Sequence, residues 1–209
     1  SDILGLECAG EVVEVGEEVR RVKAGDKVCA LLAGGGYAEE VVVPAGLVLP
    51  IPDGLTYVEA ASIPEVYATA YLNLYMEADL SIGEKVLLHA GASGVGTAAI
   101  QLLKYSKNPS FVTVGNADKL RRCRDLGADS GFIRHDGSFL NAVSEWSGKS
   151  GVDVILDPVG ANYFSDNISC LSIDGRLVLI GLLGGQSTEL NMGFLMMKRI
   201  SVIGSTLRA

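Results

Sequence analysis

The 209-residue sequence lacks a long apolar run, an excess of positive charge and a secretory-type beginning. No apolar stretch reaches the ~18 residues of a membrane-spanning helix. The first residues, SDILGLECAG, show no basic segment followed by an apolar one, so we expect no secretory signal. The formal net charge of −8 disfavours nucleic acid or an anionic membrane as a partner. A small anionic ligand held by a local cluster of donors stays open.

Paired cysteine motifs are absent as well. The four cysteines are widely separated and form no C-x-x-C pair: Cys8, Cys29, Cys123 and Cys170. We interpret them as reduced thiols rather than disulfides or zinc ligands, which favours a cytoplasmic location. The two histidines are His89, inside an apolar run, and His135, which has no cysteine or histidine neighbour at ligand spacing. We therefore expect no metal site.

Residues 1–66 are predicted to form a small β domain. Short runs rich in β-branched residues, AGEVVEVG, GDKVCAL and YAEEVVVP, are separated by glycine, proline and charged turns. The prolines of VVPAGLVLPIPDGL would interrupt a helix, and this half shows no helical pattern. We therefore expect a small barrel or sandwich of strands.

Residues 67–209 are predicted to alternate between strands and helices, after a helical stretch that begins at Val66. The predicted strands are KVLLHA, FVTVG, GFIR, GVDVILDPV, RLVLIG and ISVIGST. Helices are expected over 95–105 and over ADKLRRCRDLG, FLNAVSEWSG and NYFSDNISCL. Apolar strands joined by helical crossovers indicate a parallel, doubly wound sheet with helices on both faces. The predicted fold class is α/β, with the six strands of a dinucleotide-binding Rossmann domain.

The string GASGVG, residues 91–96, joins a predicted strand to a predicted helix. Gly91 and Gly96 match the first and third glycines of the fingerprint G-x-G-x-x-G, and Ser93 stands at the second. The serine hydroxyl can donate to a phosphate oxygen. Gly94 and Val95 supply backbone N–H groups at a helix N-terminus, where the dipole favours an anion. Tight packing of strand against helix also explains such glycines, but the position of the string favours phosphate binding.

Residues near the second and third strands of this half favour NADPH over NADH. An NAD site carries an acid about 20 residues beyond the glycines, and Asn116 stands there instead. Lys119 follows, and Arg134 ends the third predicted strand beside the same ribose edge. Both cations would attract a 2′-phosphate.

Two alternatives stay open at this position. Lys119, Arg121 and Arg122 also suit a solvated helix face, which we expect for at least one of the two arginines. Asp118 could turn inward and serve as the acid of an NAD site.

The combination of several segments resembles one family. GLECAGEVVEVG, GDKVCALLAGGGYAEEVVVP, PIPDGL, AASIPEVYATAY, HAGASGVGTAAIQL and DGRLVLIGLLGG are together similar to the zeta-crystallin-like quinone oxidoreductases of the medium-chain dehydrogenase/reductase superfamily. The likeness runs from end to end and is closest to the branch that includes the p53-inducible quinone oxidoreductase. It implies a GroES-like catalytic domain joined to a Rossmann domain, NADPH as cofactor, and a quinone or enone as substrate. It also implies a homodimer paired through ISVIGST.

The resemblance also implies site residues. The family's phosphate turn falls on 90–96, and its 2′-phosphate motif falls on GNADK, with Asn116 replacing serine and Lys119 retained. Arg134 replaces a tyrosine that relatives often carry near the adenosine phosphate. Thr69 corresponds to a threonine near the nicotinamide. The turns after the fourth and fifth strands are implied to line the ribose and nicotinamide, and they contain Asp157, Val159, Gly160, Gly181, Leu182, Leu183 and Gly184.

Departures from the family pattern limit what the resemblance implies. Leu6 stands at the histidine ligand of zinc-dependent members, so we expect a zinc-independent enzyme. Parts of the family's catalytic domain before SDILGLE and after the sixth strand are expected to be missing, so cofactor binding should survive better than turnover. Tyr37 and Tyr67 suit packing, and we assign no catalytic residue.

The expected function is transfer of a hydride from NADPH to a quinone or a similar conjugated carbonyl compound. An enone or enoyl-thioester reductase of the same superfamily is one alternative. A truncated, non-catalytic NADPH-binding protein is another. An NAD-linked alcohol dehydrogenase is disfavoured by Leu6 and Asn116 together.

Overall fold

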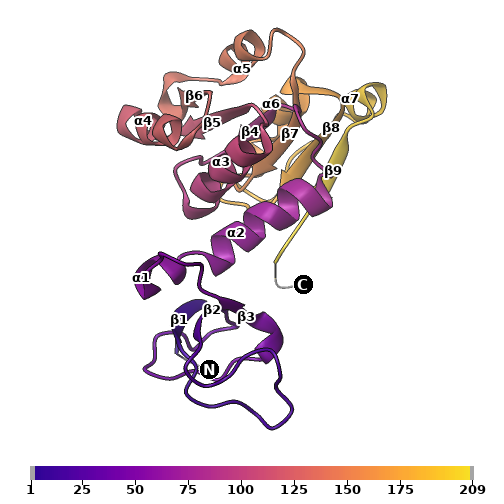
Figure 1. Cartoon of the computed structure of the whole chain (residues 1–209). Helices are drawn as coiled ribbons and strands as arrows, with labels where there is room; N and C mark the ends of the chain where they lie inside the picture. Colours follow the sequence, from indigo (N-terminus) through magenta and orange to yellow (C-terminus); the bar gives the residue numbers. More distant parts are fainter. Residues whose placement is uncertain (1–2, 208–209) are drawn as a thin grey trace. The chain divides into compact units, whose positions relative to one another are not determined.

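The computed structural model describes residues 3–207, and the chain divides into two compact units, residues 1–68 and 69–209. Figure 1 shows that each unit is built around a sheet of its own. The division falls within helix α2 (Pro64–Tyr71). Within residues 3–207, no helix has the length and apolar character needed to cross a membrane.

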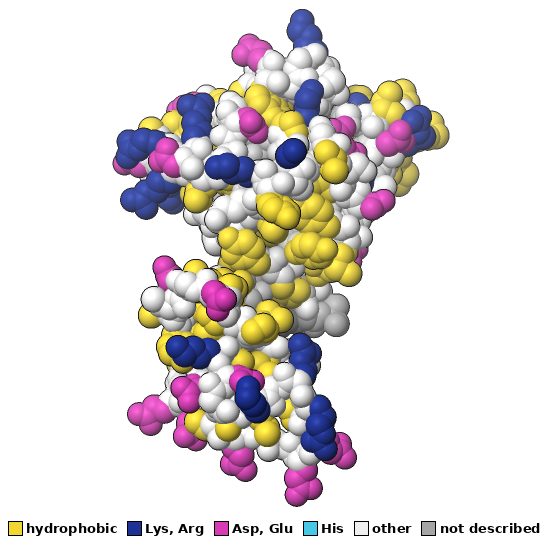
Figure 2. Space-filling model, viewed as in Figure 1, with side chains coloured by type: hydrophobic (Ala, Val, Ile, Leu, Met, Phe, Trp, Pro, Cys, Tyr) yellow, Lys and Arg dark blue, Asp and Glu magenta, His cyan; other side chains and the backbone are white. Residues whose placement is uncertain are grey.

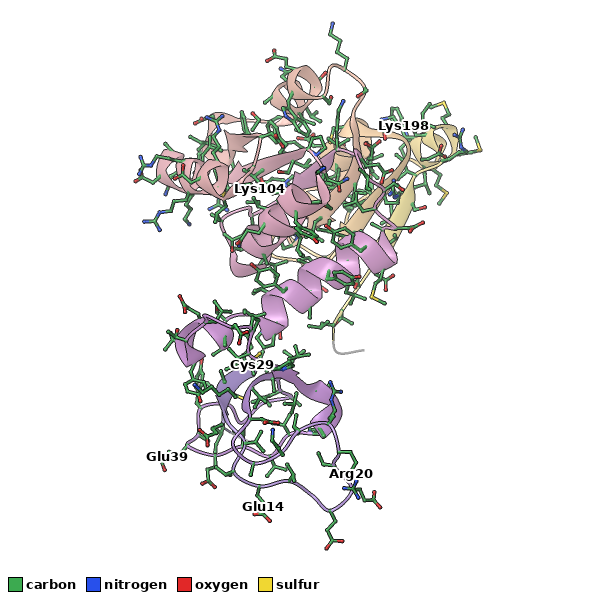
Figure 3. All side chains as sticks on the ribbon, viewed as in Figure 1. Glu14, Arg20, Cys29, Glu39, Lys104 and Lys198 are labelled. Carbon is green, nitrogen blue, oxygen red and sulfur yellow. The ribbon has the colours of Figure 1, made fainter. Side chains whose placement is uncertain are left out.

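The first unit contains a three-stranded antiparallel sheet in the order β1-β2-β3. Its elements are β1 (Glu7–Glu11), β2 (Lys27–Leu31), the 3₁₀ helix η1 (Ala45–Leu47), β3 (Val48–Pro50) and helix α1 (Tyr57–Ala60). Cys29 on β2, labelled in Figure 3, is buried together with Ala30, Leu32 and Val48. These side chains form the small core of the unit.

Three expectations for the first half are wrong. YAEEVVVP forms no strand: among residues 3–207, no backbone hydrogen bond joins 38–43 to a neighbouring segment, and a strand requires such a partner. The strand expected over AGEVVEVG is displaced to Glu7–Glu11. The half also contains helix α1, which begins with a capping box. Thr56 Oγ1 accepts from the Glu59 amide at 3.3 Å, and the Glu59 carboxylate accepts from the Thr56 amide at 2.9 Å.

The second unit contains a six-stranded parallel sheet in the order β6-β5-β4-β7-β8-β9. The strands are β4 (Val86–Leu88), β5 (Ser110–Val114), β6 (Ser130–Ile133), β7 (Val152–Asp157), β8 (Leu171–Leu179) and β9 (Ser201–Gly204). The helical elements are the π-helix η2 (Leu72–Glu77), α3 (Gly94–Ser106), α4 (Ala117–Leu126), the 3₁₀ helix η3 (Arg134–Asp136), α5 (Leu140–Trp146), α6 (Ala161–Cys170) and α7 (Met192–Lys198). This strand order is that of a Rossmann sheet and confirms the predicted α/β fold class.

The central strands β4, β5 and β7 of this sheet are buried on both faces. Leu87 pairs with Phe111 on one side and Ile155 on the other, and Ile155 pairs in turn with Leu177, so four side chains form one row across the sheet. This row belongs to a core cluster that includes side chains from the α5 and α6 region, such as Val143. The residues next to Leu87, Phe111 and Ile155 in their strands point to the opposite face of the sheet, and they are buried too. Apolar runs without polar alternation are therefore required in these strands.

Helix α7 was not expected from the sequence. Its segment, MGFLMMK, leaves several methionine and phenylalanine side chains exposed, so it shows little apolar periodicity. The helix begins at Asn191, whose Oδ1 accepts from the amides of Gly193 and Phe194. At its other end Lys198, labelled in Figure 3, donates from Nζ to the backbone oxygens of Ile168, Ser169 and Leu171. Lys198 thus ties α7 to the end of α6, and Leu195 of the helix packs against the hydrophobic core.

Candidate cofactor site

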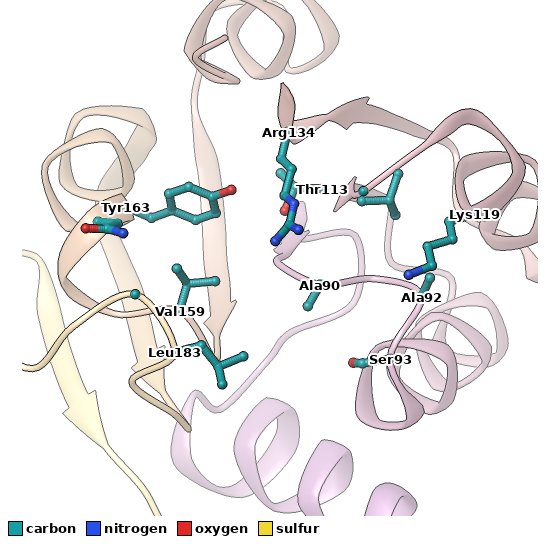
Figure 4. Close-up of a pocket in the computed structure, with 13 residues that line it drawn as sticks. Ala90, Ala92, Ser93, Thr113, Lys119, Arg134, Val159, Tyr163 and Leu183 are labelled. Atoms are coloured by element: carbon teal, nitrogen blue, oxygen red, sulfur yellow. The ribbon is translucent and has the colours of Figure 1, made fainter. Parts of the chain in front are cut away.

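A cavity of about 370 Å³ lies at the carboxyl ends of the central strands of the second unit. Open α/β sheets bind ligands at this edge, where the strand order reverses between β4 and β7. Figure 4 shows the cavity with its labelled side chains. The lining residues are Ala90, Ala92, Ser93, Thr113, Val114, Gly115, Lys119, Arg134, Val159, Asn162, Tyr163, Leu183 and Gly184.

The turn after β4 presents hydrogen-bond donors at the N-terminus of α3. Ser93 is the N-cap residue, and its Oγ accepts from the Gly96 amide at 3.1 Å, which leaves the hydroxyl proton for another acceptor. The amides of Gly94 and Val95 are the first of the helix and have no acceptor within it. Ser93 and Gly94 are exposed. The turn is therefore suited to an anion such as a diphosphate.

Two glycines of this turn serve packing. A Cβ on Gly91 would lie 2.6 Å from the Val112 Cβ, and a Cβ on Gly96 would lie 2.6 Å from the Ala90 and Gly91 oxygens. Both residues are buried. Packing and anion binding are thus divided along the string: Gly91 and Gly96 bring strand and helix together, and 93–95 carry the donors.

Two cations extend into the cavity from separate elements. Lys119 comes from the first turn of α4, and Arg134 follows β6; Figure 4 shows both side chains directed at the cavity. Arg134 Nε lies 3.4 Å from His135 Nε2. Within residues 3–207, neither Lys119 nor Arg134 is paired with a carboxylate. Their positive charge is available to a ligand.

The neighbouring polar residues of α4 play other parts. Asn116 caps the helix, with Oδ1 accepting from the Lys119 amide at 2.9 Å, and does not line the cavity. Asp118 pairs with Arg121 at 2.9 Å, and both side chains are exposed. Asp118 is therefore directed away from the position of an NAD-site acid. In Figure 2 the dark blue side chains of lysine and arginine gather over α4, because its sequence, ADKLRRCRDL, is rich in these residues.

The turn after β7 is organised by Asp157, which is fully buried. Its carboxylate accepts from the amides of Val159 at 2.6 Å and Gly160 at 3.2 Å, and from Asn167 Nδ2 at 3.0 Å. Burial raises the pKa of Asp157, and these N–H donors oppose the rise by stabilising the charged form. The carboxylate thus fixes the backbone of the turn through these hydrogen bonds and does not line the cavity.

The turns after β7 and β8 are joined to each other. The Gly184 amide donates to Val159 O at 2.7 Å, and the Ala161 amide donates to Gly185 O at 3.0 Å. A Cβ on Gly184 would lie 2.8 Å from Val159 Cγ1, and one on Gly181 would lie 2.9 Å from Pro158 O. These glycines allow close contact between two turns that both border the cavity.

The structure brings part of the predicted site together. The residues that line the cavity are Ser93, Lys119, Arg134, Val159, Leu183 and Gly184. Those in the adjoining turns and caps are Gly91, Gly94, Val95, Gly96, Asn116, Asp157, Gly160, Gly181 and Leu182. Thr69 lies in α2, where its backbone oxygen accepts from Asn73 Nδ2 at 2.7 Å, and it does not line the cavity.

Several lining residues were not expected. Thr113 and Gly115 follow from the rule that ligands bind at the carboxyl ends of strands, since Thr113 is the second-last residue of β5 and Gly115 follows the strand directly. Asn162 and Tyr163 lie in the first turn of α6, and no motif in the sequence marks them. Figure 4 shows Tyr163 directed across the cavity toward the side of Arg134.

The described side chains do not fit a zinc site. Within residues 3–207, no three histidine, cysteine or acidic side chains converge as metal ligands. Both ring nitrogens of His89 are hydrogen-bonded, to Thr113 and Asn167. All four cysteines are free, and burial raises the pKa of the Cys170 thiol to about 12, which disfavours the thiolate that zinc requires.

Comparison with known families assigns both parts of the chain. The model of the zinc-binding dehydrogenase family matches residues 94–209, and that of the alcohol dehydrogenase GroES-like domain matches residues 2–53. The chain therefore belongs to the zinc-binding dehydrogenase family, within the medium-chain dehydrogenase/reductase superfamily. Although the family is described as zinc-binding, the described residues of this chain contain no converging set of zinc ligands.

Three known proteins illustrate the relationship. The lovastatin diketide synthase of Aspergillus terreus is 38% identical over 188 residues, which is 87% of this chain and 8% of that protein. The crystal structure of Escherichia coli quinone oxidoreductase complexed with NADPH has a TM-score of 0.87 and 30% identity, and the match covers 98% of this chain and 64% of that one. The CurK enoyl reductase has a TM-score of 0.86 and 28% identity, covering 99% and 62%. The chain spans less than two-thirds of each.

We predict that His89 makes stability depend on pH. Burial lowers its pKa to about 4, opposed by its hydrogen bond to Asn167, while the unfolded chain titrates near 6.5. Between these values the unfolded state binds more protons, so the free energy of unfolding should fall on acidification, by up to about 3 kcal/mol at pH 4. Urea unfolding of the wild type and of His89→Gln from pH 7 to pH 4 measures this. Equal slopes for the two proteins would contradict the prediction.

Proposed function

We propose that this chain binds NADPH and supports transfer of its hydride to a quinone. The observation that carries the proposal is the pair of cations, Lys119 and Arg134, which face the cavity and have no carboxylate partner among residues 3–207. The adenosine 2′-phosphate distinguishes NADPH from NADH, and two cations from separate elements suit an anion between them. The Escherichia coli structure that holds NADPH shares the fold over 98% of this chain, which supports the choice of cofactor.

Different residues around the cavity are proposed to bind different parts of the dinucleotide. The diphosphate is placed at the amides of 93–95, where the dipole of α3 favours negative charge. The turns after β7 and β8, fixed by Asp157 and by their mutual hydrogen bonds, are placed beside the ribose and nicotinamide. When bound, NADPH supplies the hydride. The role of the chain is to orient the dinucleotide and to keep it in one geometry.

A conjugated acceptor suits the proposed zinc-independent reaction, since residues 3–207 contain no converging set of metal ligands. A quinone accepts a hydride readily, so hydrogen-bond donors of the protein are proposed to replace the Lewis acid of zinc-dependent relatives. Leu6 is half-exposed and cannot coordinate a metal. We also propose that the chain belongs to the zeta-crystallin-like branch of quinone oxidoreductases, on the segments given above.

A second candidate substrate is a 2-enoyl thioester. The 38% identity to the lovastatin diketide synthase and the shared fold of the CurK enoyl reductase favour it. Both acceptors are conjugated and take a hydride at carbon or oxygen from the same cofactor, so the cofactor site is common to the two proposals.

Removing either cation should weaken NADPH binding selectively. We expect Lys119→Ala and Arg134→Ala each to raise the Kd for NADPH about tenfold and to leave the Kd for NADH nearly unchanged, because NADH lacks the 2′-phosphate. Isothermal titration with both cofactors measures this. Arg121→Ala is the matched control, since Arg121 is paired with Asp118 outside the cavity. An equal loss for both cofactors would place the cations away from the 2′-phosphate.

The two acceptors can be separated in one assay. With NADPH held constant, we expect faster oxidation of the cofactor with 9,10-phenanthrenequinone than with a 2-enoyl thioester. Faster turnover of the thioester would make the second candidate the function. Tight binding of NADPH with no turnover of either acceptor would instead support a non-catalytic NADPH-binding chain.

We further propose that two copies of the chain pair through β9. Among the described strands β9 ends the six-stranded sheet, and its Val202 side chain is exposed. Met196 and Met197 on the preceding helix α7 are exposed as well. An uncovered edge strand is satisfied by the same strand of a second copy across a two-fold axis. Light scattering should give twice the 21.9 kDa mass of the chain, and a monomer at high concentration would contradict the pairing.

A further inference from the structure

Behind the cavity, four buried polar side chains form a continuous chain of hydrogen bonds. Thr113 Oγ1 lies 2.9 Å from His89 Nδ1, His89 Nε2 lies 2.7 Å from Asn167 Oδ1, and Asn167 Nδ2 lies 3.0 Å from Asp157 Oδ2. All four residues are at most 3% exposed. They come from the end of β5, the turn after β4, helix α6 and the end of β7. This chain of hydrogen bonds therefore crosses the edge of the sheet at which the candidate cofactor site lies.

The chemistry of the two ends determines where each proton lies. The Asp157 carboxylate already accepts from two backbone amides, so Asn167 must direct its NH₂ group at it and its oxygen at His89. His89 must then donate from Nε2. A neutral imidazole with its proton on Nε2 accepts at Nδ1, so the Thr113 hydroxyl donates to it. Each of these hydrogen bonds therefore has a defined direction.

Three residues that line the cavity are in contact with members of this hydrogen-bonded chain. Thr113 lines it directly and is bound to His89. The Tyr163 ring lies 4.7 Å from the His89 ring, between centroids, and forms the opposite wall. Val159 lines the cavity, and its amide is held by Asp157 at 2.6 Å. Figure 4 labels all three among the residues that line the cavity, with Tyr163 and Val159 on the same side.

We propose that His89 is a positioning residue of the cofactor site, which holds Thr113, Tyr163 and the Val159 turn at the mutual spacing that a dinucleotide requires. The inference rests on the proposed function, since it takes the cavity to be the NADPH site. His89 touches neither cofactor nor substrate in this account. Its effect passes through the three lining residues, which belong to three separate elements. The effect is therefore on the whole dinucleotide and not on the 2′-phosphate alone.

Thr113→Val tests the proposal, because valine keeps the shape of threonine and lacks the proton donated to His89. We expect the Kd for NADPH and the Kd for NADH to rise by the same factor, about fivefold, as for the loss of one neutral hydrogen bond. Thr113→Ser keeps the hydroxyl and should restore both values. Thr188→Val, the same change at an exposed site of the second unit, is the matched control. Binding is measured well below the melting temperature, so that a loss of stability alone leaves Kd unchanged.

The nitrogen resonances of His89 provide a second measurement on the wild-type chain, which does not depend on the folding of a variant. ¹⁵N-edited spectra should show the proton on Nε2 in the free protein and a shift of both ring nitrogens on addition of NADPH. A proton on Nδ1, resonances that NADPH leaves unmoved, or equal Kd values for Thr113→Val and wild type would overturn the positioning role. Failure of the wild type to bind either cofactor would instead overturn the proposed function, and the positioning role with it.

Discussion

Coverage of the sheet on both faces is the constraint on which the rest of the second unit depends. The side chains of Leu87, Leu88, Ile155 and Leu177 are all essentially inaccessible to solvent, so a ligand cannot reach the middle of the central strands from either face. Water and ligands reach the sheet at its edges. At the carboxyl edge, residues that follow β4 supply the donors, residues that follow β5 and β6 supply the cations, and residues that follow β7 and β8 supply the turns of the candidate site.

A chain with a net charge of −8 is an unfavourable environment for a polyanion in general. Screening restricts each charge to about 10 Å at ordinary ionic strength, so the local arrangement decides the affinity. Among residues 3–207, the two cations at the cavity have no carboxylate partner. Asp118 is paired with Arg121 on the surface, and the buried Asp157 carboxylate accepts from N–H donors in the interior. The positive charge at the cavity is therefore not compensated by Asp118 or Asp157, which are paired with other groups.

Much of the second unit was predictable from the sequence, because apolar runs separated by helical segments leave few arrangements of a parallel sheet. The strand order and the glycine turn with Ser93 follow from that pattern. The first unit was predicted less well, since YAEEVVVP has the composition of a strand but no partner among the described residues. Tyr163 and Asn162 could not be predicted as lining residues, because they enter the cavity through the packing of α6 and not through a local motif.

The steric role of Gly91 and Gly96 has a consequence for how such sequences diverge. A side chain at either position would collide with backbone or with a packed valine, so the fold itself disfavours replacement of either glycine, whatever the turn binds. Lys119 and Arg134 pack against little and are retained only while a ligand selects for them. In a lineage that abandoned the nucleotide, the glycine signature would persist as a relic, and the two cations would drift first.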